Sequence, residues 1–189
     1  MTKSELRKIY KEKRTQLSPG EVEKNNDLIL INFQKINLPF ISHLHTYISS
    51  PKLREPETSS IIRYLQFKNP GLTVMVPKIN MASGEMQHLH FEEETELEDS
   101  IFGIPEPASG KAFEPHEIDL VLVPLLAFDK YGFRVGYGKG HYDKFLSKCR
   151  NDIIKAGISL FEPVDEIDDI DQYDIPLNYC VTPQHVFEF

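Results

Sequence analysis

The sequence predicts an α/β fold, with helices covering both faces of a mostly parallel central sheet. Strand and helix signals alternate along most of the chain, which is the pattern of such sheets. The most apolar segment reads IDLVLVPLLAF over residues 118–128, and this run, interrupted only by Asp119, suits a central strand buried on both faces. The length of 189 residues favours a single domain, 1–189.

Two helices are predicted at the start of the chain, each introduced by a capping box. Thr2 and Glu5 have the spacing at which a hydroxyl and a carboxylate satisfy the first free N–H groups of a helix. Ser18 and Glu21 repeat the pattern with a proline at the first helical position. We expect the second helix to run to about Ile36.

The remaining elements follow from apolar periodicity and from turn residues. Helices are predicted at 57–68 and from the end of the glycine-rich turn through Cys149. Loops are predicted at 92–100 and 102–110. Strands are predicted at 43–49, 72–77, 86–91, 118–128, 153–160 and 180–189.

Composition limits the classes of protein to which the chain can belong. Hydrophobic residues make up 40% and charged residues 26%, which excludes a wholly disordered chain. No apolar run approaches the ~20 residues of a membrane-spanning helix, and the charged start lacks the apolar region of a secretory signal. The net charge of −8 disfavours nucleic acid as a partner. We therefore expect a cytoplasmic protein with neither nucleic-acid nor membrane partners. A monomer is expected as well, although composition does not bear on the oligomeric state.

The turn that leaves the apolar strand carries the strongest functional signal. Four glycines lie within the nine positions 132–140, so backbone N–H groups can approach an anion closely. Arg134 and Lys139 add charge, and residues 130–150 hold six basic side chains but one acidic side chain. The spacing matches neither a Walker A loop nor a dinucleotide fingerprint. We interpret the turn as a phosphate cradle, the alternative being a set of tight turns with solvated charges.

Segment 123–146, VPLLAFDKYGFRVGYGKGHYDKFL, resembles the signature of the 5-formyltetrahydrofolate cyclo-ligase family, also called methenyltetrahydrofolate synthetases. Residues 3–7 are similar to the K-x-x-L-R segment of that family. Glu57-Thr58 resembles the start of its E-T helix, and residues 103–107 resemble its G-I-x-E-P turn. These motifs span nearly the whole chain in the expected order, and the glycine-rich segment is the specific one.

The resemblance implies a three-layer α/β/α fold of the sugar-phosphate-isomerase and CoA-transferase-like type. It also implies a ligase of folate one-carbon metabolism whose substrates are ATP and 5-formyltetrahydrofolate and whose cofactor is Mg²⁺. In that family the formyl oxygen attacks the γ-phosphate of ATP. N10 then displaces phosphate as the ring closes to 5,10-methenyltetrahydrofolate.

Residue roles can be carried over by position from the resemblance. Arg134 and Lys139 would be catalytic, stabilising charge on the transferred phosphoryl group. Glu57 and Tyr142 would contact the folate. Asp143 would bind Mg²⁺, the alternative being an acid that favours a helix start. ATP would be held by Lys3, Arg7, Arg134, Gly136, Gly138, Lys139, Gly140, His141 and Tyr142.

Two positions depart from the family pattern. His141 stands where relatives more often have Tyr or Phe, so a polar contact could replace a stacking one. Asn178 stands where relatives often carry Asp, which would weaken a second metal ligand if that carboxylate assists the metal.

Two further groups of residues could have a function, but a structural interpretation is favoured for each. His43 with His45, and His88 with His90, each place two imidazoles on one face of a strand. A zinc site is conceivable there, but surface or core histidines are favoured. Segment 161–174 holds seven acidic residues and no basic one. We expect it to be a solvated loop opposite the basic site.

Three functional classes remain open from the sequence. The cyclo-ligase is favoured. A non-catalytic protein with the same loop would bind ATP or folate without turnover. An isomerase or acyl-transferase of the related fold would need its own glutamate nucleophile or base, and no residue near the loop is a candidate for one.

Overall fold

The computed structural model describes residues 1–80, 82–100 and 104–189. Within these residues an eight-stranded sheet has the order β12-β11-β10-β7-β1-β2-β3-β6. The five parallel strands are β1 (His43–His45), β2 (Thr73–Ile79), β7 (Leu120–Pro124), β10 (Ile154–Ile158) and β11 (Tyr179–Val181). Antiparallel pairing adds β12 (Val186–Glu188) at one edge, and β3 (Met86–His90) and β6 (Ala112–Phe113) at the other. The predicted α/β class with a mostly parallel sheet is confirmed.

Strand β7 occupies the middle of the sheet because its side chains are apolar on both faces. Leu120 and Leu122 join the core cluster on one face, whereas Val121 and Val123 join the cluster on the other. All four are fully buried. The unbroken apolar run of the sequence therefore marks the central strand, as predicted.

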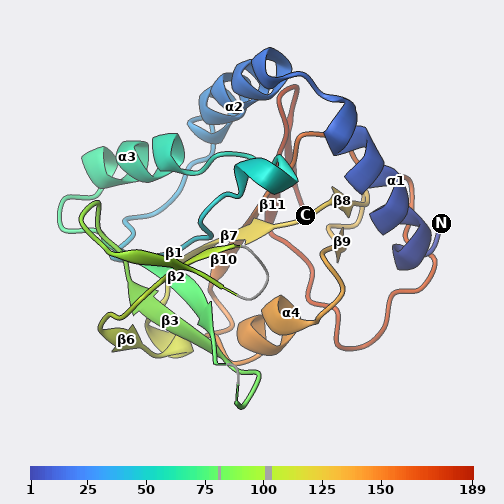
Figure 1. Cartoon of the computed structure of the whole chain (residues 1–189). Helices are drawn as coiled ribbons and strands as arrows, with labels where there is room; N and C mark the ends of the chain where they lie inside the picture. The colour runs from blue at the N-terminus through green and yellow to red at the C-terminus, as the bar shows by residue number, and fades with distance from the viewer. Residues whose placement is uncertain (81, 101–103) are drawn as a thin grey trace.

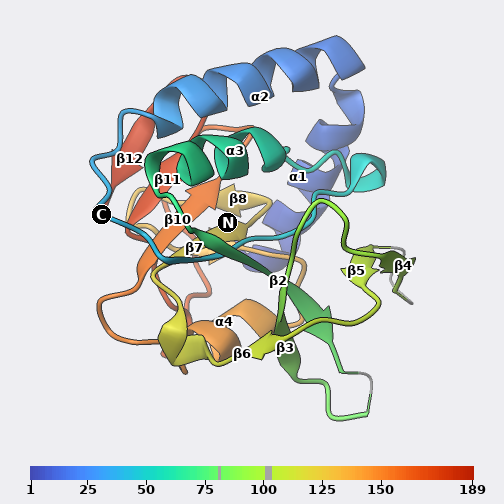
Figure 2. The same ribbon diagram turned by 90° about the vertical axis from the view of Figure 1, so that its left-hand side faces the viewer.

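Helices form a layer on each side of the sheet. Helices α2 (Pro19–Phe33) and α3 (Ser59–Lys68) cover one face, and α4 (His141–Leu146) covers the other (Figures 1 and 2). Phe33 of α2 and Leu65 of α3 are buried in the first core cluster, and Phe145 of α4 is buried in the second. The three-layer arrangement implied by the resemblance is present.

Helix α1 (Lys3–Gln16) packs at one side of this sandwich, against a small hairpin (Figure 1). The hairpin consists of β8 (Ala127–Phe128) and β9 (Arg134–Val135). The predicted capping boxes are present at both α1 and α2. The packing of α1 against the hairpin places the start of the chain against the glycine-rich turn.

Several predicted boundaries differ from the structure. The strand predicted over 118–128 stops at Pro124, and the chain then turns away to form the β8–β9 hairpin. A proline has no N–H for a ladder and is poorly suited to a continuing central strand. The predicted loop at 92–100 contains β4 (Leu97–Asp99), which pairs with β5 (Pro105–Pro107). Residues 102 and 103 of the other predicted loop lie outside the described residues.

Other differences are shifts of a few residues at element ends. Helix α2 ends at Phe33, α3 begins at Ser59 and α4 ends at Leu146. The strand predicted at 43–49 is regular only over His43–His45. The strand predicted at 180–189 is the β11–β12 hairpin. Two short 3₁₀ helices, Pro51–Leu53 and Pro115–Glu117, complete the described elements.

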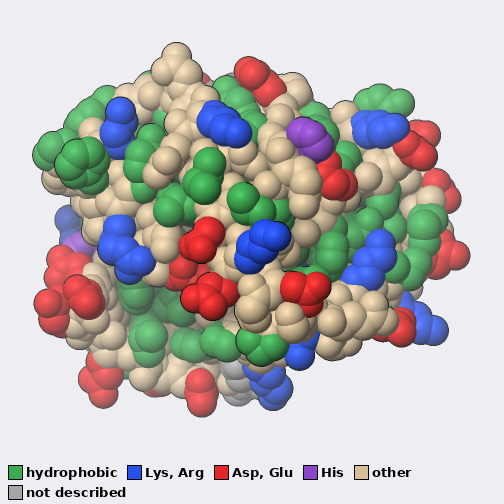
Figure 3. Space-filling model, turned by 90° about the horizontal axis from the view of Figure 1, so that it is seen from above, with side chains coloured by type: hydrophobic (Ala, Val, Ile, Leu, Met, Phe, Trp, Pro, Cys, Tyr) green, Lys and Arg blue, Asp and Glu red, His purple; other side chains and the backbone are tan. Residues whose placement is uncertain are grey.

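The surface mixes acidic and basic side chains. Seen from above, the two charge types are interspersed over the visible face, with no continuous basic area (Figure 3). None of the helices in the described ranges combines the length and the apolar character needed to cross a membrane.

His45 of β1 and His88 of β3 lie together in the core beneath α4. Their ring centroids are 5.0 Å apart, and the Phe145 ring lies 4.6 Å from His45 and 4.2 Å from His88. Neither ring nitrogen of His45 has a hydrogen-bond partner. Burial lowers the pKa of His45 well below its usual value and lowers the pKa of His88 to about 4. Both are therefore core histidines, in their neutral form at neutral pH.

This pair makes stability sensitive to acid. The folded-state pKa values are depressed, so the unfolded chain binds protons that the folded chain cannot as pH falls below about 6.5. Stability should be full above that pH and fall by about 1–2 kcal/mol by pH 5 through His88 alone. Urea unfolding at several pH values should show a smaller loss for the His45→Leu/His88→Leu double variant.

His116, which is exposed, supplies the control. His116→Gln should keep the wild-type dependence of stability on pH. An unchanged dependence in the double variant would show that other groups cause the acid sensitivity.

Candidate active site

A cleft of about 1030 Å³ lies beyond the carboxyl ends of the parallel strands. Its lining includes Tyr47, Ile79 and Pro124, which lie at or just past the ends of β1, β2 and β7. Open α/β sheets commonly bind ligands at this edge. The glycine-rich turn supplies one wall of the cleft, from Gly136 to Asp143.

The lining combines basic and apolar side chains. Lys3, Arg7 and Lys11 project into the cleft from α1, and their spacing of four residues places them on one face of the helix. The apolar part is formed by Tyr47, Ile48, Pro77, Ile79, Met86, Ile104 and Pro105. The cleft can therefore accept an anionic group and a flat apolar group together.

Helix α1 holds the glycine loop, residues 136–140, by direct contacts. Arg7 donates a hydrogen bond from Nε to the carbonyl oxygen of Gly136 over 3.0 Å. Gly138 has φ +99°, and a Cβ there would lie 3.2 Å from Nε of Arg7. Only glycine combines this backbone conformation with so close an approach. Gly140, with φ +67°, caps the start of α4.

The cleft collects every predicted site residue except Glu57. Its lining includes Lys3, Arg7, Arg134, Gly136, Gly138, Lys139, Gly140, His141, Tyr142 and Asp143. Burial, followed by the charges of Lys139 and Lys144, lowers the pKa of His141. His141 thus presents a neutral imidazole to the cleft at neutral pH.

Arg134 and Asp143 form an ion pair inside the wall of the cleft. Nη2 of Arg134 lies 2.7 Å from Oδ1 of Asp143, and their side chains are 5% and 28% exposed. Arg134 also donates to the carbonyl oxygen of Ile175, and the Ile175 N–H donates to the same Asp143 oxygen over 3.2 Å. The guanidinium fork is thus directed at protein groups, and its predicted contact with phosphate stays a prediction.

Glu57 and Glu55 have different surroundings, although they are two residues apart. Glu57 accepts a hydrogen bond from the Ser59 N–H over 2.8 Å at the start of α3, and it does not line the cleft. Glu55 lines the cleft, is 8% exposed and accepts a 2.9 Å bond from the Ser50 N–H. The predicted folate contact of Glu57 stays untested, whereas Glu55 is a cleft residue that sequence reasoning missed.

The acidic segment 161–174 does not lie opposite the basic site, so that prediction is wrong. Asp171 and Asp174 line the same cleft as Lys3. The Lys3 ammonium pairs with Asp174 and lies 3.8 Å from Asp171. Nearby, the Met1 ammonium lies 2.7 Å from Oδ1 of Asp168. The positive start of α1 draws the acidic segment toward the cleft.

The carboxylates of the cleft provide hard oxygen donors. In the part of the chain that the structure describes, no group of three His, Cys, Asp or Glu side chains is placed to hold a metal ion. Magnesium in phosphate-transfer sites needs fewer protein ligands, because it takes one or two carboxylates and the phosphates themselves. Asp143 lines the cleft and accepts a hydrogen bond from the Ile175 N–H, and Asp174, the residue before Ile175, lines the cleft as well. These two carboxylates fit such a shared site.

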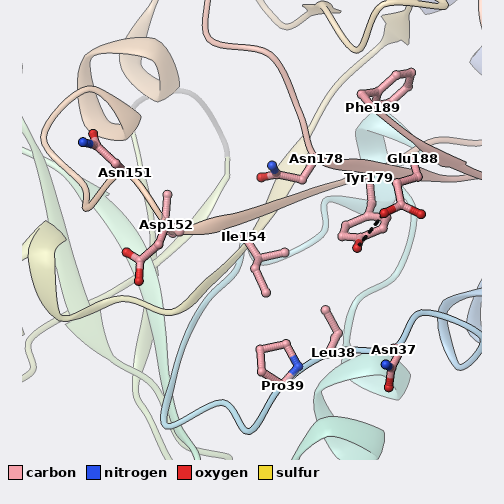
Figure 4. Close-up of a pocket in the computed structure, with 11 residues that line it drawn as sticks. Asn37, Leu38, Pro39, Asn151, Asp152, Ile154, Asn178, Tyr179, Glu188 and Phe189 are labelled. Carbon is pink, nitrogen blue, oxygen red and sulfur yellow. Dashed lines mark hydrogen bonds between the residues drawn. The ribbon is translucent and has the colours of Figure 1, made fainter.

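A second, smaller hollow of about 220 Å³ lies at the opposite edge of the sheet, where β10 begins (Figure 4). Asn178 lines this hollow together with Asn37 and Asp152. Its side-chain oxygen accepts a 2.9 Å hydrogen bond from the Lys155 N–H. Asn178 does not line the large cleft, so its difference from relatives does not alter the lining there.

Comparison with known proteins shows the family of the chain. The model of the 5-formyltetrahydrofolate cyclo-ligase family matches residues 1–183. The chain belongs to this family. A probable 5-formyltetrahydrofolate cyclo-ligase of Caenorhabditis elegans is 29% identical, over 95% of this chain and 91% of that protein.

Solved structures of this family have the same fold. The NMR structure of Aquifex aeolicus 5,10-methenyltetrahydrofolate synthetase matches with a TM-score of 0.79 and 27% identity, over 100% of this chain and 93% of that one. A 5,10-methenyltetrahydrofolate synthetase of Mycoplasma pneumoniae matches with a TM-score of 0.75 and 25% identity, over 97% and 99%. The family resemblance of the glycine-rich segment is therefore confirmed over the whole chain.

Proposed function

We propose that this cyclo-ligase binds ATP and 5-formyltetrahydrofolate side by side in the large cleft. It converts the folate to 5,10-methenyltetrahydrofolate and releases ADP and phosphate. The observation that carries the proposal is the family match over residues 1–183, whose characteristic glycine-rich segment forms one wall of that cleft. The cleft volume of about 1030 Å³ suits two substrates.

The proposed reaction proceeds by phosphoryl transfer and then ring closure. The formyl oxygen bonds to the γ-phosphorus as the bond from phosphorus to the bridging oxygen breaks, and ADP leaves. N10 then attacks the activated formyl carbon, whose bond to the phosphate oxygen breaks, and N10 loses its proton to solvent. Such chemistry requires aligned substrates and charge stabilisation more than covalent help from the protein.

The basic side chains of the cleft would perform this task. Lys139 and Arg7 lie at the glycine loop and would stabilise charge on the phosphates, with Lys3 beside them. Neutral His141 would donate a hydrogen bond where relatives more often stack an aromatic ring. Arg134 would act through Asp143, which its guanidinium orients.

Mg²⁺ is part of the proposal. Asp143 and Asp174 would hold it together with the phosphates, and it would neutralise charge on the transferred group. A cytoplasmic location and a monomeric state belong to the same proposal, and sedimentation of the purified chain tests the latter.

Turnover is the first prediction. Product absorbance in the near ultraviolet should rise only when ATP, magnesium and 5-formyltetrahydrofolate are all present. Lys139→Ala should lower kcat/KM by roughly 10²–10⁴ and so exclude a contaminating enzyme. Folded protein that gives no product under any metal or pH condition would overturn the proposed function.

We propose that Glu55, which lines the cleft, contacts the folate, and Glu57 is its matched comparison. Glu55→Gln should raise the KM for the folate by about tenfold or more, because a buried charge-assisted hydrogen bond is lost at the cleft. Glu57→Gln should leave both KM values near wild type and lower stability by less than about 1 kcal/mol, since Glu57 caps α3. Steady-state kinetics with each substrate varied would decide, and the reverse pattern would return the role to Glu57.

Asp143→Asn tests the metal ligand. The amide keeps the size of the side chain but carries no charge, so the magnesium concentration for half-maximal rate should rise strongly, with partial recovery at high magnesium. Loss of the partner of Arg134 should also lower the melting temperature. A lowered melting temperature with unchanged magnesium dependence would assign Asp143 to structure alone.

A further inference from the structure

A partly buried chain of hydrogen bonds joins three separate segments beside the cleft. Nη1 of Arg14, in α1, donates to the hydroxyl oxygen of Tyr137 over 2.9 Å. The Tyr137 hydroxyl donates in turn to Oε1 of Glu55 over 2.7 Å. The other Glu55 oxygen accepts the bond from the Ser50 N–H. Both carboxylate oxygens of Glu55 are therefore fixed in direction.

The outer end of this chain is firmly anchored. Arg14 is 3% exposed, and its Nη2 donates to the carbonyl oxygen of Leu125, just after β7. Arg54, the neighbour of Glu55, donates to carbonyl oxygens at the end of α1, among them that of Thr15. Helix α1 and the segment that carries Glu55 are thus held together from both sides.

Tyr137 is suited to be the link between the two ends. It lies between Gly136 and Gly138 of the glycine loop, and it lines the cleft, as Glu55 does. Burial is the main cause that raises the pKa of Tyr137 well above its usual value. The hydroxyl therefore keeps its proton and always donates it toward Glu55, while a lone pair accepts from Arg14.

We propose that Tyr137 is a positioning residue that orients Glu55 toward the folate and couples this contact to nucleotide binding at the glycine loop. The inference rests on the proposed function, in which the loop holds ATP and Glu55 contacts the folate. A nucleotide bound at residues 136–140 adds contacts on either side of Tyr137 and so strengthens the hold on the Tyr137–Glu55 hydrogen bond. Folate should bind more tightly to the nucleotide-loaded enzyme than to the free enzyme.

The test is a double-mutant cycle on Tyr137→Phe and Glu55→Gln. Tyr137→Phe removes only the hydroxyl, and it should raise the KM for the folate at saturating ATP roughly tenfold. Because the coupling is reciprocal, the KM for ATP at saturating folate should rise as well, whereas the affinity for ATP measured without folate should stay within about twofold. If Tyr137 acts through Glu55, the double variant should be no worse than Glu55→Gln alone. Additive losses would assign the two residues independent effects and overturn the inference.

A binding measurement separates positioning from simple packing. Folate affinity is measured with and without a non-hydrolysable ATP analogue; the analogue should tighten it in the wild-type enzyme but not in Tyr137→Phe. Tyr131→Phe is the matched control, because Tyr131 lies in the same glycine-rich turn but is 62% exposed. It should retain the coupling. Equal coupling in Tyr137→Phe and wild type would overturn the inference.

The Arg14→Lys variant and the turnover of the wild-type enzyme serve as further tests. If Tyr137→Phe proves unstable by circular dichroism, Arg14→Lys takes its place, since it weakens the same chain from the other end. Arg14→Lys should reduce the coupling, and full wild-type coupling in that variant would overturn the inference. Absence of turnover in the wild-type enzyme would refute the proposed function itself, whereas normal turnover without coupling would refute only the role of Tyr137.

Discussion

The contact between helix α1 and the glycine loop is the constraint on which the rest of the site depends. Arg7 reaches over Gly138 to the carbonyl oxygen of Gly136, and Arg14 reaches the hydroxyl of Tyr137. A flexible turn with four glycines would lose much backbone entropy on forming a fixed binding wall. Two arginines on one rigid helix impose the conformation from outside, which explains why residues near the start of the chain belong to a site built mainly from residues 134–143.

Local sequence signals predicted what depends on neighbours in the chain. The capping boxes of Thr2 and Ser18, and the unbroken apolar run of β7, each act within a few residues, and the structure contains them. The glycine-rich segment is continuous, so most of its residues could be assigned to one site from the sequence. The β8–β9 hairpin was missed because a continuing apolar run resembles a longer strand, and only the proline at 124 marks its end.

What could not be predicted depends on contacts between distant segments. Glu55 and Glu57 differ little as sequence, yet one turns into the cleft toward Tyr137, 82 residues away, and the other caps α3. The acidic segment is mostly exposed, as expected, but it was expected to lie opposite the basic site. Its true position follows from the start of α1, whose positive groups attract it, and no local pattern encodes that pairing.

The pairing of cleft cations with carboxylates bears on how a chain of net charge −8 binds an anion. In the structure Lys3 already has the carboxylate of Asp174 as partner, and Arg134 has that of Asp143. A triphosphate that approaches these cations also approaches their carboxylates, and two anions sharing one cation in a partly buried cleft repel each other. A divalent cation between phosphate and carboxylate converts this repulsion into attraction, since both supply the oxygen ligands that magnesium prefers. The charge arrangement therefore gives a physical reason for the proposed magnesium requirement, independent of the resemblance that first suggested it.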